Sequence, residues 1–170
     1  MKMWYIAQAI SVIAMTTSVL SVQCKSTRRY FVFQAVASIL FMTSYIINGA
    51  FDSAVCNAIG ILKNVFVLND KTRTRPYFLL TCVLSIGTSL MTITSWWSLV
   101  LLAQLLVGVY IAWYCDGATI RKVRFCFNSP IWLINNIFVS FNIGGILSDT
   151  FLMTSIIISF IRYGKDGFTK

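Results

Sequence analysis

Seven long apolar runs restrict what this chain of 170 residues can fold into. They cover residues 4–22, 30–47, 53–68, 77–94, 97–113, 125–141 and about 143–161. Each is close to the roughly 17 to 25 residues that a helix needs to cross a bilayer. We expect helices because lipid offers no water to an open backbone, and because the alternating pattern of barrel strands is missing. The sequence therefore predicts an all-α, polytopic membrane protein, a single transmembrane domain over residues 1–170 with about seven transmembrane helices.

Composition excludes a water-soluble domain. Hydrophobic residues make up 58% of the chain, charged residues make up 11%, and the mean hydropathy is +0.78. The formal net charge is +9, but the basic residues fall in short clusters between the apolar runs. That pattern is typical of the cytoplasmic face of a membrane protein and not of a DNA-binding surface. We therefore expect the lipid bilayer as a partner and no nucleic acid.

Every second connection between the apolar runs is basic. The residues concerned are Lys25, Arg28 and Arg29; Lys71, Arg73 and Arg75; Arg121, Lys122 and Arg124; and, after the last run, Arg162, Lys165 and Lys170. The intervening connections, residues 48–52, 94–95 and 142–149, contain no Lys or Arg. Because basic loops stay in the cytoplasm, the amino terminus is expected outside and the carboxyl terminus inside. The first run is predicted to be a helix and not a cleaved signal peptide, since no Ala-x-Ala cleavage pattern follows it.

The side chains that most enzymes use are scarce. The chain has no His and no Glu, and its five acidic residues are all Asp. The five cysteines, at positions 24, 56, 82, 115 and 126, lack the paired spacing of metal or redox motifs. We interpret them as small packing residues, and we expect no enzyme activity, no metal site and no cofactor.

An internal repeat is indicated when the chain is aligned with itself at an offset of 96 residues, the spacing between Gln8 and Gln104. The same offset pairs Lys25 with Arg121, Arg28 with Arg124, Ser44 with Ser140, Tyr45 with Phe141 and Gly49 with Gly145. It predicts a three-plus-one-plus-three architecture with two parallel units, 4–69 and 97–162, joined by a linker helix at 77–94. The site would then lie between the units. Gln8 and Gln104 are interpreted mainly as interhelical hydrogen-bonding residues.

The third apolar run carries a polar stripe. Asn57, Gly60 and Asn64 recur at helical spacing, with Lys63 beside Asn64. Such a stripe can line a polar path or a substrate site, or it can pack helices closely. Lys63 is the one basic side chain well inside an apolar run, and it either faces a cavity or extends to the headgroups of the nearby cytoplasmic surface.

The sixth run is the most site-like stretch. Asn128, Trp132 and Asn135 share one helix face, Asn136 lies beside them, and Pro130 is expected to kink the helix. An aromatic ring with amides on one stripe can stack on and hydrogen-bond a neutral, ring-shaped or hydroxylated solute. Ordinary helix packing by the same residues is the alternative.

Two aspartates follow glycines near helix starts. The carboxylates of Asp52 and Asp149 can cap free N–H groups at the positive end of a helix, or they can couple transport to a proton or cation. Coupling is favoured more at Asp149, because its apolar run begins before it. The Gly144-Gly145 pair is interpreted as a tight turn.

Several short stretches carry a family resemblance. They are residues 4–8, Asn57-Ala58-Ile59, and Ile143-Gly144-Gly145 followed by Asp149 and a run that ends at Phe160-Ile161-Arg162. In these stretches the chain resembles the YgjV-like bacterial inner-membrane proteins. That resemblance implies a bacterial inner membrane and leaves the substrate open. Members often carry a basic residue where this chain has Gly60, with Lys63 one turn on, and Glu where Asp149 stands. The layout is also similar, at fold level alone, to the sugar-permeating SWEET and vitamin-importing PnuC families.

The leading functional prediction is a small-solute transporter or facilitator. Its candidate site, between the two units, consists of Asn57, Lys63, Trp132, Asn135 and Asn136, and its solute would be neutral or anionic. The alternative is a non-transporting membrane partner or assembly protein, whose polar residues only pack helices. A membrane enzyme is a third, weaker alternative, and a homo-oligomer is left open.

Overall fold

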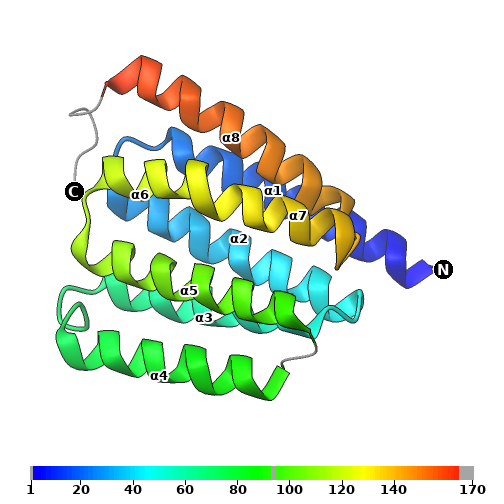
Figure 1. Cartoon of the computed structure of the whole chain (residues 1–170). Coiled ribbons are helices and arrows are strands. Elements are labelled where there is room, and N and C mark those ends of the chain that lie inside the picture. Colours follow the sequence, from blue (N-terminus) through cyan, green and yellow to red (C-terminus); the bar gives the residue numbers. More distant parts are fainter. Residues whose placement is uncertain (1, 93–94, 165–170) are drawn as a thin grey trace.

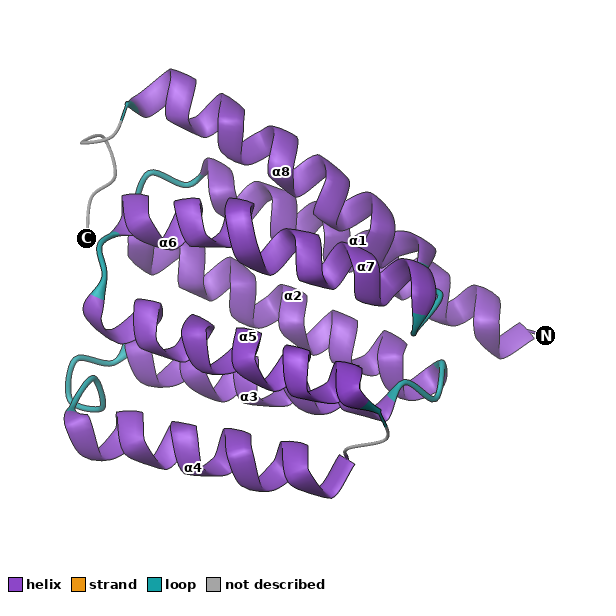
Figure 2. Cartoon of the chain, viewed as in Figure 1, coloured by secondary structure: helices purple, strands orange, loops and turns teal. Residues whose placement is uncertain are grey.

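A bundle of nearly antiparallel helices makes up the computed structural model, which describes residues 2–92 and 95–164 (Figures 1 and 2). The elements are α1 (Lys2–Gln23), α2 (Thr27–Ile47), α3 (Phe51–Leu68), α4 (Arg75–Thr92), α5 (Trp96–Tyr114), α6 (Gly117–Val123), the π-helical turn η1 (Arg124–Asn128), α7 (Ser129–Phe138) and α8 (Ile143–Tyr163). Because α6, η1 and α7 follow one another without a break, they form one rod. The described residues therefore form seven helical rods and no strand, which confirms the predicted helix number.

Five of the helices are long and apolar enough to cross a bilayer: Met3–Gln23, Thr27–Ile47, Phe51–Leu68, Trp96–Tyr114 and Ile143–Tyr163. Large hydrophobic side chains cover the outside of the bundle, whereas many amides and hydroxyls lie inside it. This distribution suits a bundle that is surrounded by lipid, since polar groups there must face protein or a cavity. Residues 93–94 of the predicted linker helix, together with Lys165 and Lys170, lie outside the described residues.

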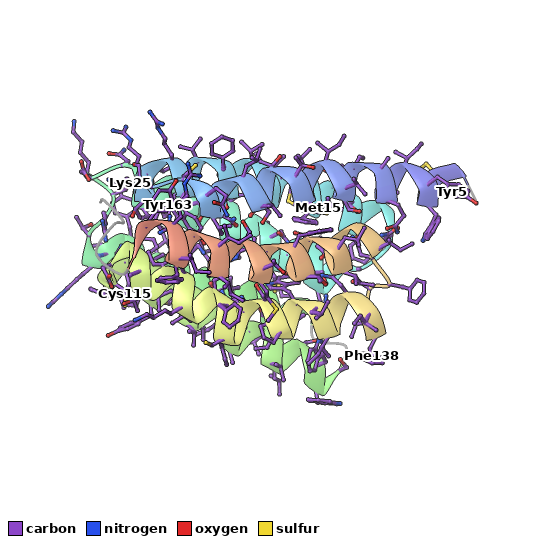
Figure 3. All side chains as sticks on the ribbon, turned by 90° about the horizontal axis from the view of Figure 1, so that it is seen from above. Tyr5, Met15, Lys25, Cys115, Phe138 and Tyr163 are labelled. Atoms are coloured by element: carbon purple, nitrogen blue, oxygen red, sulfur yellow. The ribbon has the colours of Figure 1, made fainter. Side chains whose placement is uncertain are left out.

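The two ends of the bundle differ in charge. The connections at residues 24–26, 69–74 and 115–116 lie at one end, together with the end of α8, and we call this the basic end (Figure 1). The start of α1 and the connections at 48–50 and 139–142 lie at the opposite end, called the far end below. Figure 3 shows Lys25, Cys115 and Tyr163 toward the basic end, with Tyr5 and Phe138 toward the far end.

The sixth rod begins earlier than the sequence indicated. It starts at Gly117 and not near 125, so Arg121 and Arg124, predicted to lie in a connection, belong to helical segments. The amide of Ser129 donates to the carbonyl of Arg124, five residues back, which defines the π turn. Pro130 follows this turn, lacks an N–H and cannot continue a regular α-helical ladder. Where the sequence predicted a kink at Pro130, the structure has a π turn directly before the Ser129–Pro130 pair.

Contacts join the two predicted three-helix units. α1 lies between α2 and α8, while α5 packs on α3 and α4. Under the predicted repeat α1 corresponds to α5 and α3 to α8, so the α1–α8 and α3–α5 contacts would be counterparts. The residues paired by the repeat nevertheless face different surroundings: Lys25 and Arg28 are exposed, whereas Arg121 is buried and Arg124 is half-buried. The repeat stays a prediction.

Two adjacent glycines permit close helix packing at the far end. Gly144 and Gly145 lie in the first turn of α8, so the predicted tight turn at this pair is wrong. A Cβ on Gly144 would lie 2.0 Å from Ser11 Oγ and 2.6 Å from the Ser11 carbonyl carbon in α1, and one on Gly145 would lie 2.5 Å from Asn136 Cγ in α7. Glycine therefore lets α8 approach both neighbours.

Candidate functional site

A polar cavity of about 100 Å³ lies within the bundle. We call it the central cavity; residues of α1, α2, α3, α5, the sixth rod and α8 line it. Its polar lining residues include Gln34, Tyr45, Asn57, Lys63, Asn64, Gln104, Arg124, Asn128, Ser129, Asn136 and Asp149. The lining includes two cationic side chains and one carboxylate, so the cavity carries an excess of one positive charge when all three are ionised.

The cations come from two elements, α3 and the π turn. Lys63 projects toward α5, and its Nζ lies 3.9 Å from the point where a Cβ on Gly108 would stand. The Nδ2 atom of Asn128 lies 3.8 Å from the same point. Lys63 and Asn128 thus both approach α5 at Gly108. Lys63 faces the cavity in this structure and does not extend to the basic end.

Arg124 enters the cavity through the π turn. Its Nη1 donates to Gln34 Oε1 at 2.8 Å, and the Gln34 amide in turn donates to Ser21 Oγ at 2.5 Å and Ser18 Oγ at 3.4 Å. The guanidinium is thereby anchored by neutral groups of α1 and α2. Because an extra residue in a π turn changes the phase of the helix, the turn alters which side chains point into the bundle.

Several polar atoms of the cavity wall have no protein partner. Among the residues that the structure describes, the buried atoms Arg124 Nε, Gln104 Oε1, Asn128 Oδ1 and Ser129 Oγ form no hydrogen bond. Gln104 is 6% exposed and Asn128 is 8% exposed, so bulk solvent does not compensate. Leaving a buried polar group unpaired costs roughly 1–3 kcal/mol, and native proteins rarely leave several together. Four of the nine such atoms among the described residues belong to residues that line this one cavity, and together with its two cations they make it the candidate site.

A hydrogen-bonded chain lines the cavity nearer the far end. Tyr45 Oη donates to Asn136 Oδ1 at 2.7 Å, and Asn136 Nδ2 donates to Asp149 Oδ2 at 3.0 Å. Ser140 Oγ also donates to Asn136 Oδ1, at 3.1 Å. The Trp132 ring stacks on Tyr45, with centroids 5.9 Å apart and planes at 23°. This chain ties α2, α7 and α8 together and holds the Asp149 carboxylate against the cavity.

Removing one hydroxyl tests this chain. We expect Tyr45→Phe to lower the free energy of unfolding by about 1 kcal/mol, because Asn136 loses one of two donors while the stacked ring stays. Thermal unfolding in detergent measures the change. Tyr110→Phe on the exposed face of α5 is the control and should leave the midpoint unchanged. Equal midpoints for the two variants would show that the Tyr45–Asn136 contact adds no stability.

Four of the five predicted site residues line the central cavity: Asn57, Lys63, Trp132 and Asn136. Asn57 also donates to the Ser53 carbonyl of its own helix at 2.9 Å. The fifth, Asn135, is not among the lining residues. Its Oδ1 accepts from Trp97 Nε1 at 3.2 Å and its Nδ2 donates to Ser53 Oγ at 3.0 Å. Asn135 therefore connects α7 with α5 and α3, and the structure does not bring it together with the other four predicted residues on the cavity wall.

The two predicted caps have different outcomes. Asp52 lies in the first turn of α3, near the positive end of the helix dipole, and accepts from Ser98 Oγ at 2.6 Å. Asp149 does not cap α8, because that helix begins at Ile143 and Asn142 is its N-cap, accepting from the Gly145 amide. Asp149 therefore is not the N-cap of α8, and its carboxylate lines the cavity and accepts a hydrogen bond from Asn136.

Arg124 and Gln34 were missed as site residues by the sequence analysis. Arg124 was counted with Arg121 and Lys122 as part of a basic connection, and nothing singled out Gln34. One signal was available, since Arg124 lies four residues before Asn128, on the stripe that leads to Trp132. The glutamines paired by the repeat also differ: Gln8 Oε1 accepts from the Ile143 amide at 2.9 Å, whereas Gln104 faces the cavity.

Comparison with known proteins gives one match. The profile of a family described as Imp-YgjV, bacterial inner membrane protein, matches residues 5–166. No curated protein and no solved structure matches the chain.

Proposed function

This chain belongs to the Imp-YgjV family of bacterial inner membrane proteins, and on that premise we propose that it transports or facilitates the passage of a small polar solute. It is a multi-pass inner membrane protein, and its central cavity is the proposed site. The observation that carries the proposal is the set of unpartnered polar atoms around that cavity. A packed bundle without a solute would gain stability from apolar side chains at these positions.

The proposed site follows from the cavity geometry. Asn57, Lys63, Trp132 and Asn136 contribute to it as candidate solute contacts, and Arg124 joins them. Asp149 is the proposed group for proton or cation exchange, a role supported by its burial in the cavity wall and by its hydrogen bond to the neutral Asn136 amide. We take the basic end as cytoplasmic, since basic residues are retained on that side. No catalytic step is part of this proposal.

Cysteine accessibility tests whether the cavity is wetted. All five native cysteines are free thiols, so a cysteine-free background breaks no cross-link. Ser38→Cys and Asn57→Cys place single thiols on the cavity wall, while Val36→Cys and Ala58→Cys place matched thiols on exposed, lipid-facing sides of the same helices. We expect a small, membrane-impermeant thiol reagent to label the first pair and not the second.

The opposite pattern would contradict a solute path. If, in membrane sheets with both faces open to the reagent, both cavity thiols stay unlabelled while Asn69→Cys, exposed in the α3–α4 connection, reacts normally, the cavity is closed to water from either side. The alternative of a non-transporting membrane partner or assembly protein would then be favoured. Labelling of all four positions equally would indicate an unfolded or detergent-loosened sample.

A further inference from the structure

Two like charges, Lys63 and Arg124, line the central cavity, and Asp149 is the one carboxylate among its lining residues. Arg124 acts electrostatically on Lys63. Among the described residues, neither side chain forms a salt bridge, and Lys63 forms no hydrogen bond. The Asp149 carboxylate also interacts electrostatically with Arg124, but it forms its hydrogen bond with Asn136 Nδ2 and no salt bridge with Arg124. A low-dielectric interior makes such an arrangement costly unless an anionic group joins it.

The geometry of Arg124 restricts which class of anion can bind beside it. Its Nη1 is occupied by Gln34, whereas its Nε is buried and has no acceptor among the described residues. The Nε side of a guanidinium presents two parallel N–H groups, which match the two oxygens of one carboxylate. A ligand carboxylate offsets the excess of one positive charge in the cavity when the ligand's donor group is a hydroxyl, whereas the ammonium of an amino acid would add a positive charge again.

The rest of the cavity wall indicates what else the ligand carries. The oxygens of Gln104 and Asn128 lack donors, and in either orientation of its amide each side chain offers one acceptor oxygen. A ligand with a hydroxyl or ammonium group would supply the missing donors. The cavity of about 100 Å³ lies well below the roughly 300–1,000 Å³ of sites for drug-sized molecules, so the ligand is compact.

We propose that the central cavity binds a small carboxylate that also bears a hydrogen-bond donor, a hydroxy acid or an amino acid of about three carbons, with its carboxylate between Lys63 and Arg124. This rests on the proposed function and names its substrate class. Lys63 supplies a point charge, Arg124 supplies the two-pronged contact, and the amides of Gln104 and Asn128 accept from the donor group. The stacked rings of Trp132 and Tyr45 form part of the cavity wall toward the far end.

The test is ligand-dependent thermal stabilisation of the full chain purified in detergent. The probes are L-lactate, L-alanine, propionate and glycerol, which share a three-carbon skeleton and differ in carboxylate and donor groups; sodium chloride keeps the ionic strength constant. We expect lactate or alanine to raise the unfolding midpoint, and propionate and glycerol to act at least tenfold more weakly. The better of the first two probes identifies the donor as hydroxyl or ammonium.

Substitutions at Arg124 and Lys63 test whether these two residues bind the carboxylate of the ligand. Arg124→Lys keeps the charge and removes the fork, and Lys63→Met removes a charge; each should raise the apparent Kd at least tenfold. Lys122→Met, an exposed cation in the same rod, is the matched control and should leave the Kd unchanged. If Lys63→Met fails to fold, Arg124→Lys decides alone. Unchanged Kd values in Arg124→Lys would overturn the proposal.

The outcomes separate this inference from the proposed function. If the Ser38→Cys and Asn57→Cys thiols are labelled but glycerol stabilises as well as lactate and alanine do, the solute path stands and the carboxylate assignment is wrong. Stabilisation by propionate equal to that by lactate and alanine would overturn the donor assignment. If the thiols are protected and no probe stabilises the protein, both proposals fail.

Discussion

Arg121→Ala is expected to lower the free energy of unfolding by about 3 kcal/mol, the largest effect we predict for one side chain. Arg121 is 0% exposed. Its Nη2 donates to the Cys24 carbonyl at 2.6 Å and its Nη1 to the Gly117 carbonyl at 2.9 Å, and its guanidinium lies 5.2 Å from the Tyr30 ring centroid. Alanine would remove both hydrogen bonds and leave a large void at the junction of α6 with the α1–α2 connection.

The neighbouring lysine provides the control for this prediction. Lys122→Ala alters the same helix at an exposed position, and its effect should stay within about 0.5 kcal/mol. Thermal unfolding of both variants in the same detergent measures the difference. If the Arg121 and Lys122 variants unfold together, the buried guanidinium does not hold the basic end, and the placement of Arg121 would need revision.

Gly144→Ala is expected to destabilise the bundle by about 1–3 kcal/mol through overpacking. The added methyl group would overlap Ser11 of α1, including a backbone carbon that cannot rotate away. α8 must then move from α1, which also disturbs the hydrogen bond from the Ile143 amide to Gln8 Oε1. The unfolding midpoint in detergent measures the loss.

A control substitution at a second glycine separates the effect of steric overlap from the effect of helix propensity. Gly87 lies on α4, and a Cβ there would meet nothing within 4 Å. Gly87→Ala should therefore be neutral or stabilising by up to about 1 kcal/mol, because alanine is the better helix former. A decrease for Gly87→Ala as large as that for Gly144→Ala would contradict the role of close α1–α8 packing.

The helical architecture could be predicted from the sequence because hydropathy is summed over local runs. The seven apolar runs correspond to the seven rods of the described residues, and four of the five candidate site residues line the cavity. The ends of the sixth rod were predicted less well. Charged residues at 121, 122 and 124 interrupt the apolar run, and the local pattern did not reveal that helix continues through them.

The site could be predicted only in part, because helical spacing places side chains on one face without saying which neighbour that face meets. Asn135 and Asn136 are adjacent in sequence, yet Asn136 reaches Tyr45 and Asp149 while Asn135 reaches Trp97 and Ser53. To predict Arg124 as a site residue would have required knowledge of the π turn as well. Local periodicity does not report a one-residue change of phase.

The sequence by itself determined the membrane class, the number of helices and the alternation of basic and neutral connections, since all three follow from the order of apolar and charged residues along the chain. Only the tertiary structure decided which polar residues meet. Arg121 is buried against the Cys24 carbonyl and Arg124 lines the cavity beside Gln34, whereas Lys122 between them is exposed. The physical reason is that the environment of a helical side chain depends on the phase of its helix and on the packing of helices distant in sequence, here α1, α2 and the sixth rod.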